Sequence, residues 1–114
     1  MIYLAGPLAH ADHLVVEDRA YRHAAFAVHC ATQGHVVYSP VAAWHKWSLG
    51  YGLPMTAEFW RRMSLGMLRH ACELWILRLD GWEQSEGLKD EIRLARNLGI
   101  KMRPFHPENY REAI

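Results

Sequence analysis

The chain has 114 residues, a length that suits one domain spanning residues 1–114 and leaves little room for a second. Hydrophobic residues make up 51% and charged residues 22%, a composition typical of globular proteins and not of disordered or fibrous ones. The formal net charge is only +1 and no basic stripe is visible. We therefore expect no nucleic acid polymer as a partner.

The first half of the chain predicts two strands and two helices. Residues 2–5 are a short apolar run that Gly6 and Pro7 end, which predicts a buried strand. Asp12 predicts the N-cap of a helix to about residue 33, where Gly34 ends it. The buried face of that helix is predicted to hold valines and alanines, namely Val16, Ala20, Ala24, Ala27, Val28 and Ala31. Residues 35–39 predict a second strand, and residues 41–55 a long loop.

The second half continues the alternation. Thr56 predicts the N-cap of a helix to about residue 70, and residues 74–79 predict a third strand. A third helix over residues 86–98 and a fourth strand over residues 100–105 follow. Strands that alternate with helices predict an α/β fold with a parallel sheet. We expect a single-domain, flavodoxin/Rossmann-like three-layer sandwich of four to five strands in the order 2-1-3-4.

The strand order also predicts where a ligand binds. In open parallel sheets, ligands bind at the carboxyl ends of the strands beside the point where the strand order reverses. Here that point lies between the first and third strands. It brings Tyr3 and Gly6 close to the segment 80–91.

Glu91 breaks the pattern of the third helix. The apolar stripe of this helix occupies positions 88, 91, 92, 95 and 98, and four of the five are Leu or Ile or Ala. A buried carboxylate without a partner costs several kcal/mol or shifts its pKa. One interpretation is a structural glutamate that reaches water or pairs with an arginine, of which the candidates are Arg69, Arg93 and Arg103. The other interpretation is a functional carboxylate.

The start of the same helix favours the functional interpretation. Gly87 lies one turn before Glu91, where a missing side chain lets a ligand approach the backbone. Ser85 is the predicted N-cap, and helix N-termini bind anions. Residues alone therefore predict a small anionic ligand and carboxylate chemistry at Ser85, Gly87 and Glu91.

Several segments resemble the nucleoside 2-deoxyribosyltransferase-like superfamily, including its 2'-deoxynucleoside 5'-monophosphate N-glycosidases. They are residues 2–7 (IYLAGP), residues 72–77 (CELWIL), residues 81–87 (GWEQSEG), then Glu91, Ala95 and residues 98–99. The spacing S-x-G-x-x-x-E-x-x-x-A is the most specific part. The matches span nearly the whole chain, although residues 8–70 match more loosely.

The resemblance implies roles for individual residues. Glu91 falls on the catalytic nucleophile, and Tyr3 on a tyrosine that contacts that glutamate or the sugar. Ser85 falls on the residue that contacts the 5'-phosphate in the monophosphate hydrolases, and Gly6 in the loop that lines the pocket. Ser64 falls where the family usually has an aspartate that helps the base to leave. The implied function is hydrolysis of the N-glycosidic bond of a nucleoside 5'-monophosphate or nucleoside.

Other residues near the predicted site are open to two interpretations. Asp80 either binds a ribose hydroxyl or shapes the turn before Gly81, and Trp82 either walls the pocket or packs. His45 either contacts substrate or lies on the surface. Three aromatic candidates in the 41–55 segment either stack on a base or seal a subunit contact; they are Trp44, Trp47 and Tyr51.

Two alternative functions stay open, a base-exchanging deoxyribosyltransferase and a non-catalytic nucleotide-binding module. We expect a small-molecule nucleoside or nucleotide as the ligand, no cofactor and no metal, since His10 and His13 alone make a weak metal motif. Cys30 and Cys72 are predicted to be buried thiols, which favours a cytoplasmic location. No segment approaches the apolar length of a membrane span. We also expect a homodimer or higher homo-oligomer.

Overall fold

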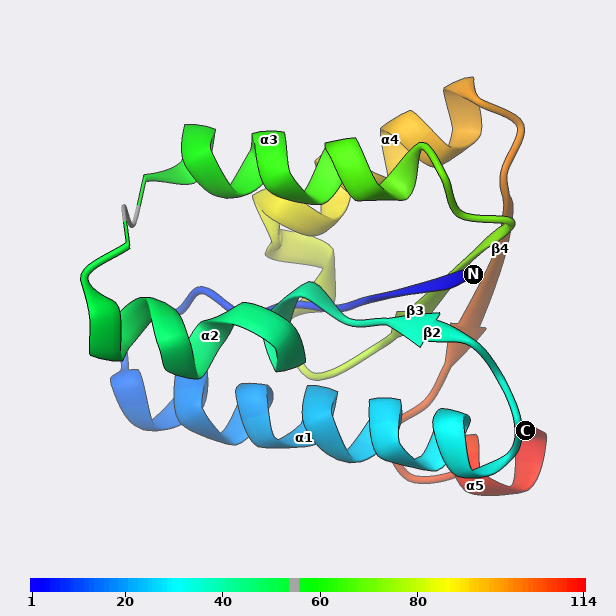
Figure 1. Cartoon of the computed structure of the whole chain (residues 1–114). Coiled ribbons are helices and arrows are strands. Elements are labelled where there is room, and N and C mark those ends of the chain that lie inside the picture. The colour runs from blue at the N-terminus through cyan, green and yellow to red at the C-terminus, as the bar shows by residue number, and fades with distance from the viewer. Residues whose placement is uncertain (54–55) are drawn as a thin grey trace.

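A computed structural model describes residues 1–53 and 56–114. Four parallel strands form one sheet in the order β2-β1-β3-β4, which confirms the predicted α/β architecture and strand order. The strands are β1 (Ile2–Ala5), β2 (Val37–Tyr38), β3 (Glu73–Leu77) and β4 (Lys101–Phe105). Figure 1 shows α3 (Ala57–Leu68) and α4 (Glu86–Asn97) above the sheet, and α1 (His13–Thr32) and α5 (Tyr110–Ala113) below it.

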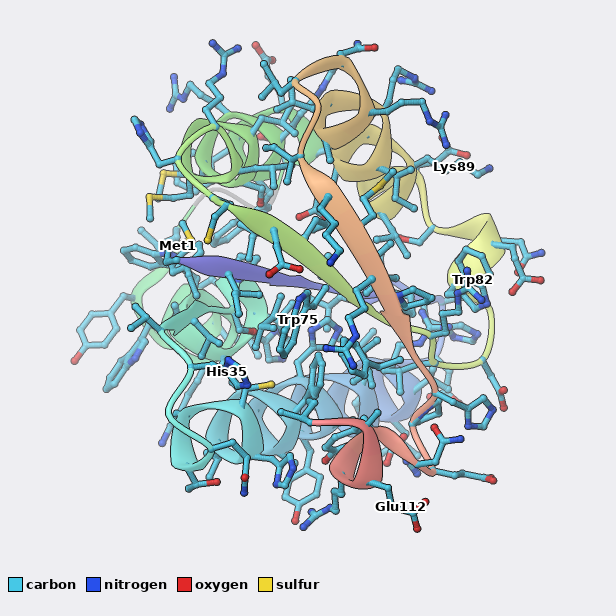
Figure 2. The ribbon with its side chains drawn as sticks, turned by 90° about the vertical axis from the view of Figure 1, so that its right-hand side faces the viewer. Met1, His35, Trp75, Trp82, Lys89 and Glu112 are labelled. Atoms are coloured by element: carbon cyan, nitrogen blue, oxygen red, sulfur yellow. The ribbon has the colours of Figure 1, made fainter. Side chains whose placement is uncertain are left out.

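Two hydrophobic clusters hold the layers together. Successive side chains of a strand point to opposite faces of the sheet. Leu4 and Trp75 therefore pack with Phe26 of α1, whereas Tyr3 and Leu74 pack on the other face with the helices α3 and α4. Figure 2 shows the side chain of Trp75 between the sheet and α1. Both faces of the sheet are covered, as a parallel sheet requires.

The predicted helix caps are confirmed where they were assigned. Asp12, Thr56 and Ser85 each accept a hydrogen bond from a backbone N–H in the first turn of their helix. Gly34 follows α1 with a φ of 91°, a left-handed conformation that favours glycine.

The predicted loop over residues 41–55 is wrong for most of its length. Residues 40–51 form α2 (Pro40–Tyr51), while residues 54 and 55 lie outside the described part of the chain. Ser39 caps this helix and Pro40 occupies its first turn, a strong start signal that the prediction read only as the end of a strand. α2 packs beside α1 near the β2 edge of the sheet (Figure 1).

The predicted buried face of α1 is wrong in part. Four of its residues are half-buried, and Ala27 packs against the core, but Val28 is 63% exposed and Ala31 is exposed. The buried residues of α1 are Arg19, His23, Phe26 and Cys30. Two of these four are polar, so a search for apolar periodicity did not select them. Cys30 is buried as expected, but Cys72 is an exposed free thiol between α3 and β3.

None of the helices in residues 1–53 and 56–114 is long and apolar enough to cross a membrane.

Gly6, the first residue after β1, has no room for a side chain. A Cβ at this position would lie 2.9 Å from the Leu77 carbonyl oxygen and 2.9 Å from Cε1 of His23. We expect Gly6→Ala to destabilise the protein by about 1–3 kcal/mol, because overpacking displaces backbone. Gly66→Ala is the matched control, since nothing lies within 4 Å of its added Cβ in α3. Chemical denaturation of both variants measures the difference, and equal stabilities would contradict the prediction.

Candidate functional site

Three elements bring polar side chains together on the α3/α4 face of the sheet. Tyr3 comes from β1 and is fully buried, and Glu91 comes from α4 with only 8% of its surface exposed. Ser64 lies on α3, within interaction range of the Tyr3 hydroxyl. The structure therefore brings Glu91, Tyr3 and Ser64 into one cluster. The strand order had predicted that the first two lie close together.

The carboxyl group of this cluster has a pKa close to neutral pH. Burial raises the pKa of Glu91 to about 7, while the Tyr3 hydroxyl acts in the opposite direction and Asp90 adds a smaller upward effect. Burial and the charge of Glu91 raise the pKa of Tyr3, so its hydroxyl keeps its proton. A carboxyl group with a pKa near 7 can serve as nucleophile, base or acid at neutral pH.

Both polar groups retain unused hydrogen-bonding capacity. Neither the Tyr3 hydroxyl nor Oε2 of Glu91 has a hydrogen-bond partner of good geometry among the described residues. Buried polar atoms are nearly always paired, so unpaired ones call for an explanation. Because Tyr3 and Glu91 act on each other's pKa, these two atoms form one buried polar pair on the α3/α4 face of the sheet.

The structural interpretation of Glu91 as an ion-paired residue is not realised in the described part of the chain. Arg93 binds Asp90, with Nη1 and Oδ1 3.1 Å apart, and Arg103 donates to the carbonyl oxygen of Ala113 at 2.9 Å. Arg69 forms no ion pair with Glu91 there either. The carboxyl group is thus buried without a neighbouring cation.

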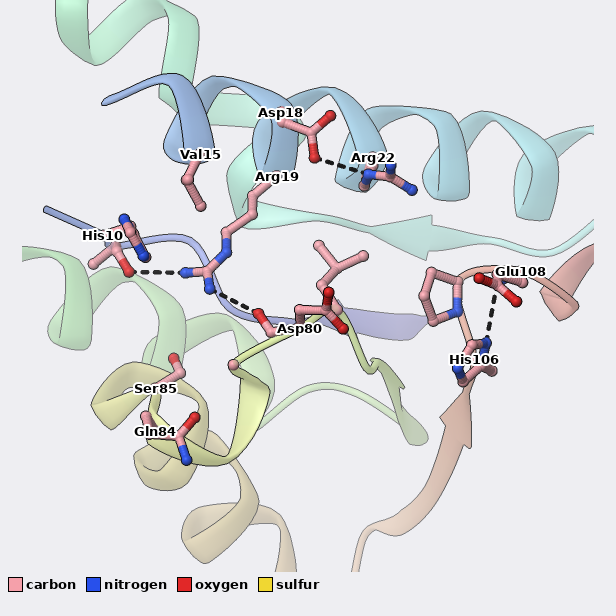
Figure 3. Close-up of a pocket in the computed structure, with 14 residues that line it drawn as sticks. His10, Val15, Asp18, Arg19, Arg22, Asp80, Gln84, Ser85, His106 and Glu108 are labelled. Atoms are coloured by element: carbon pink, nitrogen blue, oxygen red, sulfur yellow. Dashed lines mark hydrogen bonds and ion pairs between the residues drawn. The ribbon is translucent and has the colours of Figure 1, made fainter. Parts of the chain in front are cut away.

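A hollow of about 790 Å³ opens at the carboxyl ends of the strands, on the α1 side (Figure 3). Of the predicted site residues it contains Ser85 and Asp80. Tyr3, Gly6, Gly87, Glu91, Trp82 and His45 do not line it. The walls come from the β1–α1 segment, α1, the β3–α4 segment and the residues after β4; they are Ala9, His10, Val15, Asp18, Arg19, Arg22, Leu79, Asp80, Gly81, Gln84, Ser85, His106, Pro107 and Glu108.

Ser85 links the hollow to the carboxyl cluster. Its hydroxyl accepts a hydrogen bond from the Leu88 backbone N–H at 3.2 Å, which fixes the first turn of the helix that carries Glu91. Gly87 lies in that turn, and open space surrounds the position of its missing Cβ. The access for a ligand that the sequence predicted at Gly87 is therefore not blocked by the chain itself.

The remaining predicted residues occupy separate places. Trp82 lies on a short 3₁₀ turn, where it packs against the α3/α4 cluster and the Arg78 guanidinium stacks 4.5 Å from its ring centre. His45 lies on α2, and its Nε2 is 2.9 Å from Oε1 of Glu17. These two side chains have their own partners within the protein. Their assignment to substrate binding stays a prediction.

Arg19 and His23 are the functional-site residues that sequence reasoning missed. Arg19 donates from Nη1 to the Ala9 carbonyl oxygen at 2.9 Å and from Nη2 to the Asp80 carbonyl oxygen at 2.8 Å. His23 places Nε2 3.0 Å from the Pro7 carbonyl oxygen, and burial lowers its pKa to about 4. A neutral imidazole therefore donates to that carbonyl. Polar residues four apart on a helix were the available signal.

These contacts fix both segments that flank the hollow. His23 and Arg19 hold successive carbonyl oxygens of the β1–α1 segment, and Arg19 joins this segment to the turn after β3 (Figure 3). At Gly6, the first residue of the β1–α1 segment, His23 and the Leu77 carbonyl oxygen approach the backbone closely. No group of three or more His, Cys, Asp or Glu side chains is placed to hold a metal within residues 1–53 and 56–114.

Fold and site together define an α/β parallel-sheet domain with an unpaired buried carboxyl group near the carboxyl ends of its strands. Comparison with protein families gives one match, to a family described as a domain of unknown function, DUF1937, over residues 1–105. The chain belongs to that family. No curated protein matches the chain.

The raised pKa of Glu91 predicts a specific pH dependence of stability. A carboxyl group whose pKa rises from 4.5 to about 7 on folding favours the folded state below pH 4.5. That contribution, about 3 kcal/mol, is lost as the pH rises through 7. We expect Glu91→Gln to gain about this much stability relative to the wild type between pH 4 and pH 8.

Urea unfolding at several pH values measures this difference. His23 titrates equally in both proteins and therefore cancels. Glu86→Gln is the matched control, because Glu86 is exposed in the first turn of the same helix. If the free energy of unfolding changes with pH in the same way for wild type and Glu91→Gln, the pKa of the Glu91 carboxyl group does not rise on folding and the prediction is wrong.

Proposed function

We propose that the protein hydrolyses the N-glycosidic bond of a nucleoside 5'-monophosphate or nucleoside, with Glu91 as the nucleophile. The observation that carries the proposal is the buried Glu91 carboxyl group with a free oxygen beside the Tyr3 hydroxyl. The resemblance of the S-x-G-x-x-x-E-x-x-x-A segment to the nucleoside 2-deoxyribosyltransferase-like superfamily supports it.

The proposed reaction has two displacements at the anomeric carbon. The Glu91 carboxylate attacks C1' as the C1'–N bond breaks, and the base leaves with the bonding electrons and takes up a proton. Water then attacks C1', releases the Glu91 carboxylate and yields the sugar or sugar phosphate with retained configuration. The Tyr3 hydroxyl keeps the carboxylate oriented and partly stabilised before attack.

The non-catalytic alternative has one observation in its favour. Ser64 of α3 lies beside Tyr3, where the superfamily usually has an aspartate, so the described part of α3 supplies no carboxyl group at this position to protonate the leaving base. A panel of nucleosides and nucleoside monophosphates, scored for free base, distinguishes the two functions. Adding a free acceptor base to the same reactions detects exchange and so tests for a deoxyribosyltransferase.

We further propose a cytoplasmic protein that acts as a homodimer or higher homo-oligomer. Both cysteines are free thiols and Cys72 is exposed, which suits a reducing compartment. Trp47 and Tyr51 on α2 are 51% and 76% exposed, a typical feature of contact surfaces. Fractionation of the native cells and sedimentation analysis test these two statements, and a monomer at micromolar concentration would contradict the second.

Replacing the nucleophile gives the first test of the reaction. We expect Glu91→Gln to lower the rate of base release by at least about a thousandfold, as removal of a covalent nucleophile does. Glu86→Gln is the control, and it should release base at the wild-type rate. A substrate panel in which wild type and Glu91→Gln release base equally would remove Glu91 from the mechanism.

The pH profile gives the second test. Because the nucleophile acts in its ionised form, kcat/KM should rise about tenfold per pH unit below pH 7 and level off above it. The Tyr3 hydroxyl lowers the pKa of Glu91, so Tyr3→Phe should move this rise to higher pH. An unmoved profile with only a reduced plateau would mean that Tyr3 does not interact with the reacting carboxylate.

A further inference from the structure

The hollow on the α1 side contains a buried cation, Arg19, that no carboxylate of the described residues neutralises. Only 8% of Arg19 is exposed, and its guanidinium lies in the wall of the hollow. All of its hydrogen bonds go to backbone carbonyl oxygens, at 2.9 Å to Ala9, 3.4 Å to Leu8 and 2.8 Å to Asp80. No Asp or Glu oxygen of residues 1–53 and 56–114 comes within ion-pair distance of it.

Such an arrangement is costly without a ligand. A buried charge pays a desolvation penalty of several kcal/mol, which a paired opposite charge usually offsets. Carbonyl oxygens accept hydrogen bonds from Arg19 but carry no full negative charge. These three bonds also use only part of the five N–H donors of a guanidinium.

We propose that the hollow is a binding site for the anionic group of a small molecule, a phosphate monoester or a carboxylate, with Arg19 as the counter-charge. A volume of about 790 Å³ lies in the range of small-molecule sites and exceeds the needs of a lone inorganic ion. Figure 3 shows the Arg19 guanidinium between the β1–α1 segment and Asp80, with Ser85 and Gln84 on the opposite side. Guanidinium groups bind both anions through paired hydrogen bonds.

The other charges around the hollow are consistent with this role. Oδ2 of Asp18 is 2.9 Å from Nε of Arg22, so the charges of these two side chains neutralise each other. Asp80 and Glu108 carry exposed carboxylates, whose repulsion of an anion water screens strongly. The buried Arg19 charge acts at shorter range and through a drier medium. His10 and His106 add imidazole N–H groups to the same walls.

Glu91 and Tyr3 do not line the hollow, although Ser85 lines it and also caps the helix that carries Glu91. The proposal rests on Arg19 and does not rest on the glycosidase function. Glu91→Gln should bind the anion as the wild type does. Loss of base release with retained anion binding, or the reverse, therefore identifies which of the two proposals fails.

Calorimetric titration with inorganic phosphate tests the site, with acetate, a nucleoside 5'-monophosphate and the matching nucleoside as further arms. We expect phosphate and the monophosphate to bind, the nucleoside to bind at least tenfold more weakly than the monophosphate, and Arg19→Gln to weaken phosphate binding at least tenfold. Arg61→Gln is the matched control, an exposed arginine on α3 whose loss should change the affinity less than twofold. Acetate in place of phosphate as the stronger ligand would indicate a carboxylate as the natural group.

A second variant keeps the test decisive if Arg19→Gln fails to fold, since Arg19 also joins two segments. Asp80→Asn removes an exposed negative charge from the wall but leaves the backbone carbonyl that Arg19 binds. It should tighten phosphate binding two- to fivefold. The proposal is overturned if the wild type binds none of these anions at millimolar concentration, if a folded Arg19→Gln binds phosphate as the wild type does, or if Asp80→Asn leaves the affinity unchanged.

Discussion

α4 buries a carboxyl group that no cation of residues 1–53 and 56–114 neutralises, and the Tyr3 hydroxyl is the polar group beside it. A hydrocarbon at position 91 would complete the apolar stripe that Leu88 and Ala95 begin. Glu91 instead faces the hydroxyl of Tyr3, which the central strand β1 places at its side. The resulting pKa near 7 means that at neutral pH the carboxyl group is divided between its protonated and ionised forms. Folding alone does not favour such a residue.

The opposite face of the sheet also buries polar side chains where apolar ones are expected, and one of them, Arg19, is positively charged. α1 buries His23 and Arg19 against the sheet, where aliphatic side chains would have no desolvation penalty. Both side chains bind the β1–α1 segment, because its carbonyl oxygens lie outside the sheet and need hydrogen-bond donors. His23 and Arg19 supply them. The close approach of His23 in turn leaves no space for a side chain at Gly6.

The sequence allowed the strand order and most helix starts to be predicted, because these depend on local signals. Apolar runs mark β1 and β3, and Asp12, Thr56 and Ser85 are caps that act within one turn. The buried face of α1 could not be predicted from hydrophobicity, since its buried polar residues are satisfied by carbonyl oxygens that only the folded chain brings near. α2 was missed for a different reason: the Ser39-Pro40 start signal was present, but aromatic and glycine residues after it suggested a loop. Strand order and helix periodicity were enough to predict that Tyr3 and Glu91 lie at one crevice, whereas their contact was predicted only from the family resemblance.

Two buried ionisable groups of opposite type, Glu91 and Arg19, therefore have no ion-pair partner in residues 1–53 and 56–114 of this small domain. A four-stranded domain has little stability to spare, and each buried ion lowers it. Arg19 and Glu91 form no ion pair with each other within the described residues. Ser85 is the residue common to both surroundings: it lines the hollow and caps the helix on which Glu91 lies. A ligand bound at the hollow would therefore contact the helix start that sets the position of the carboxyl group.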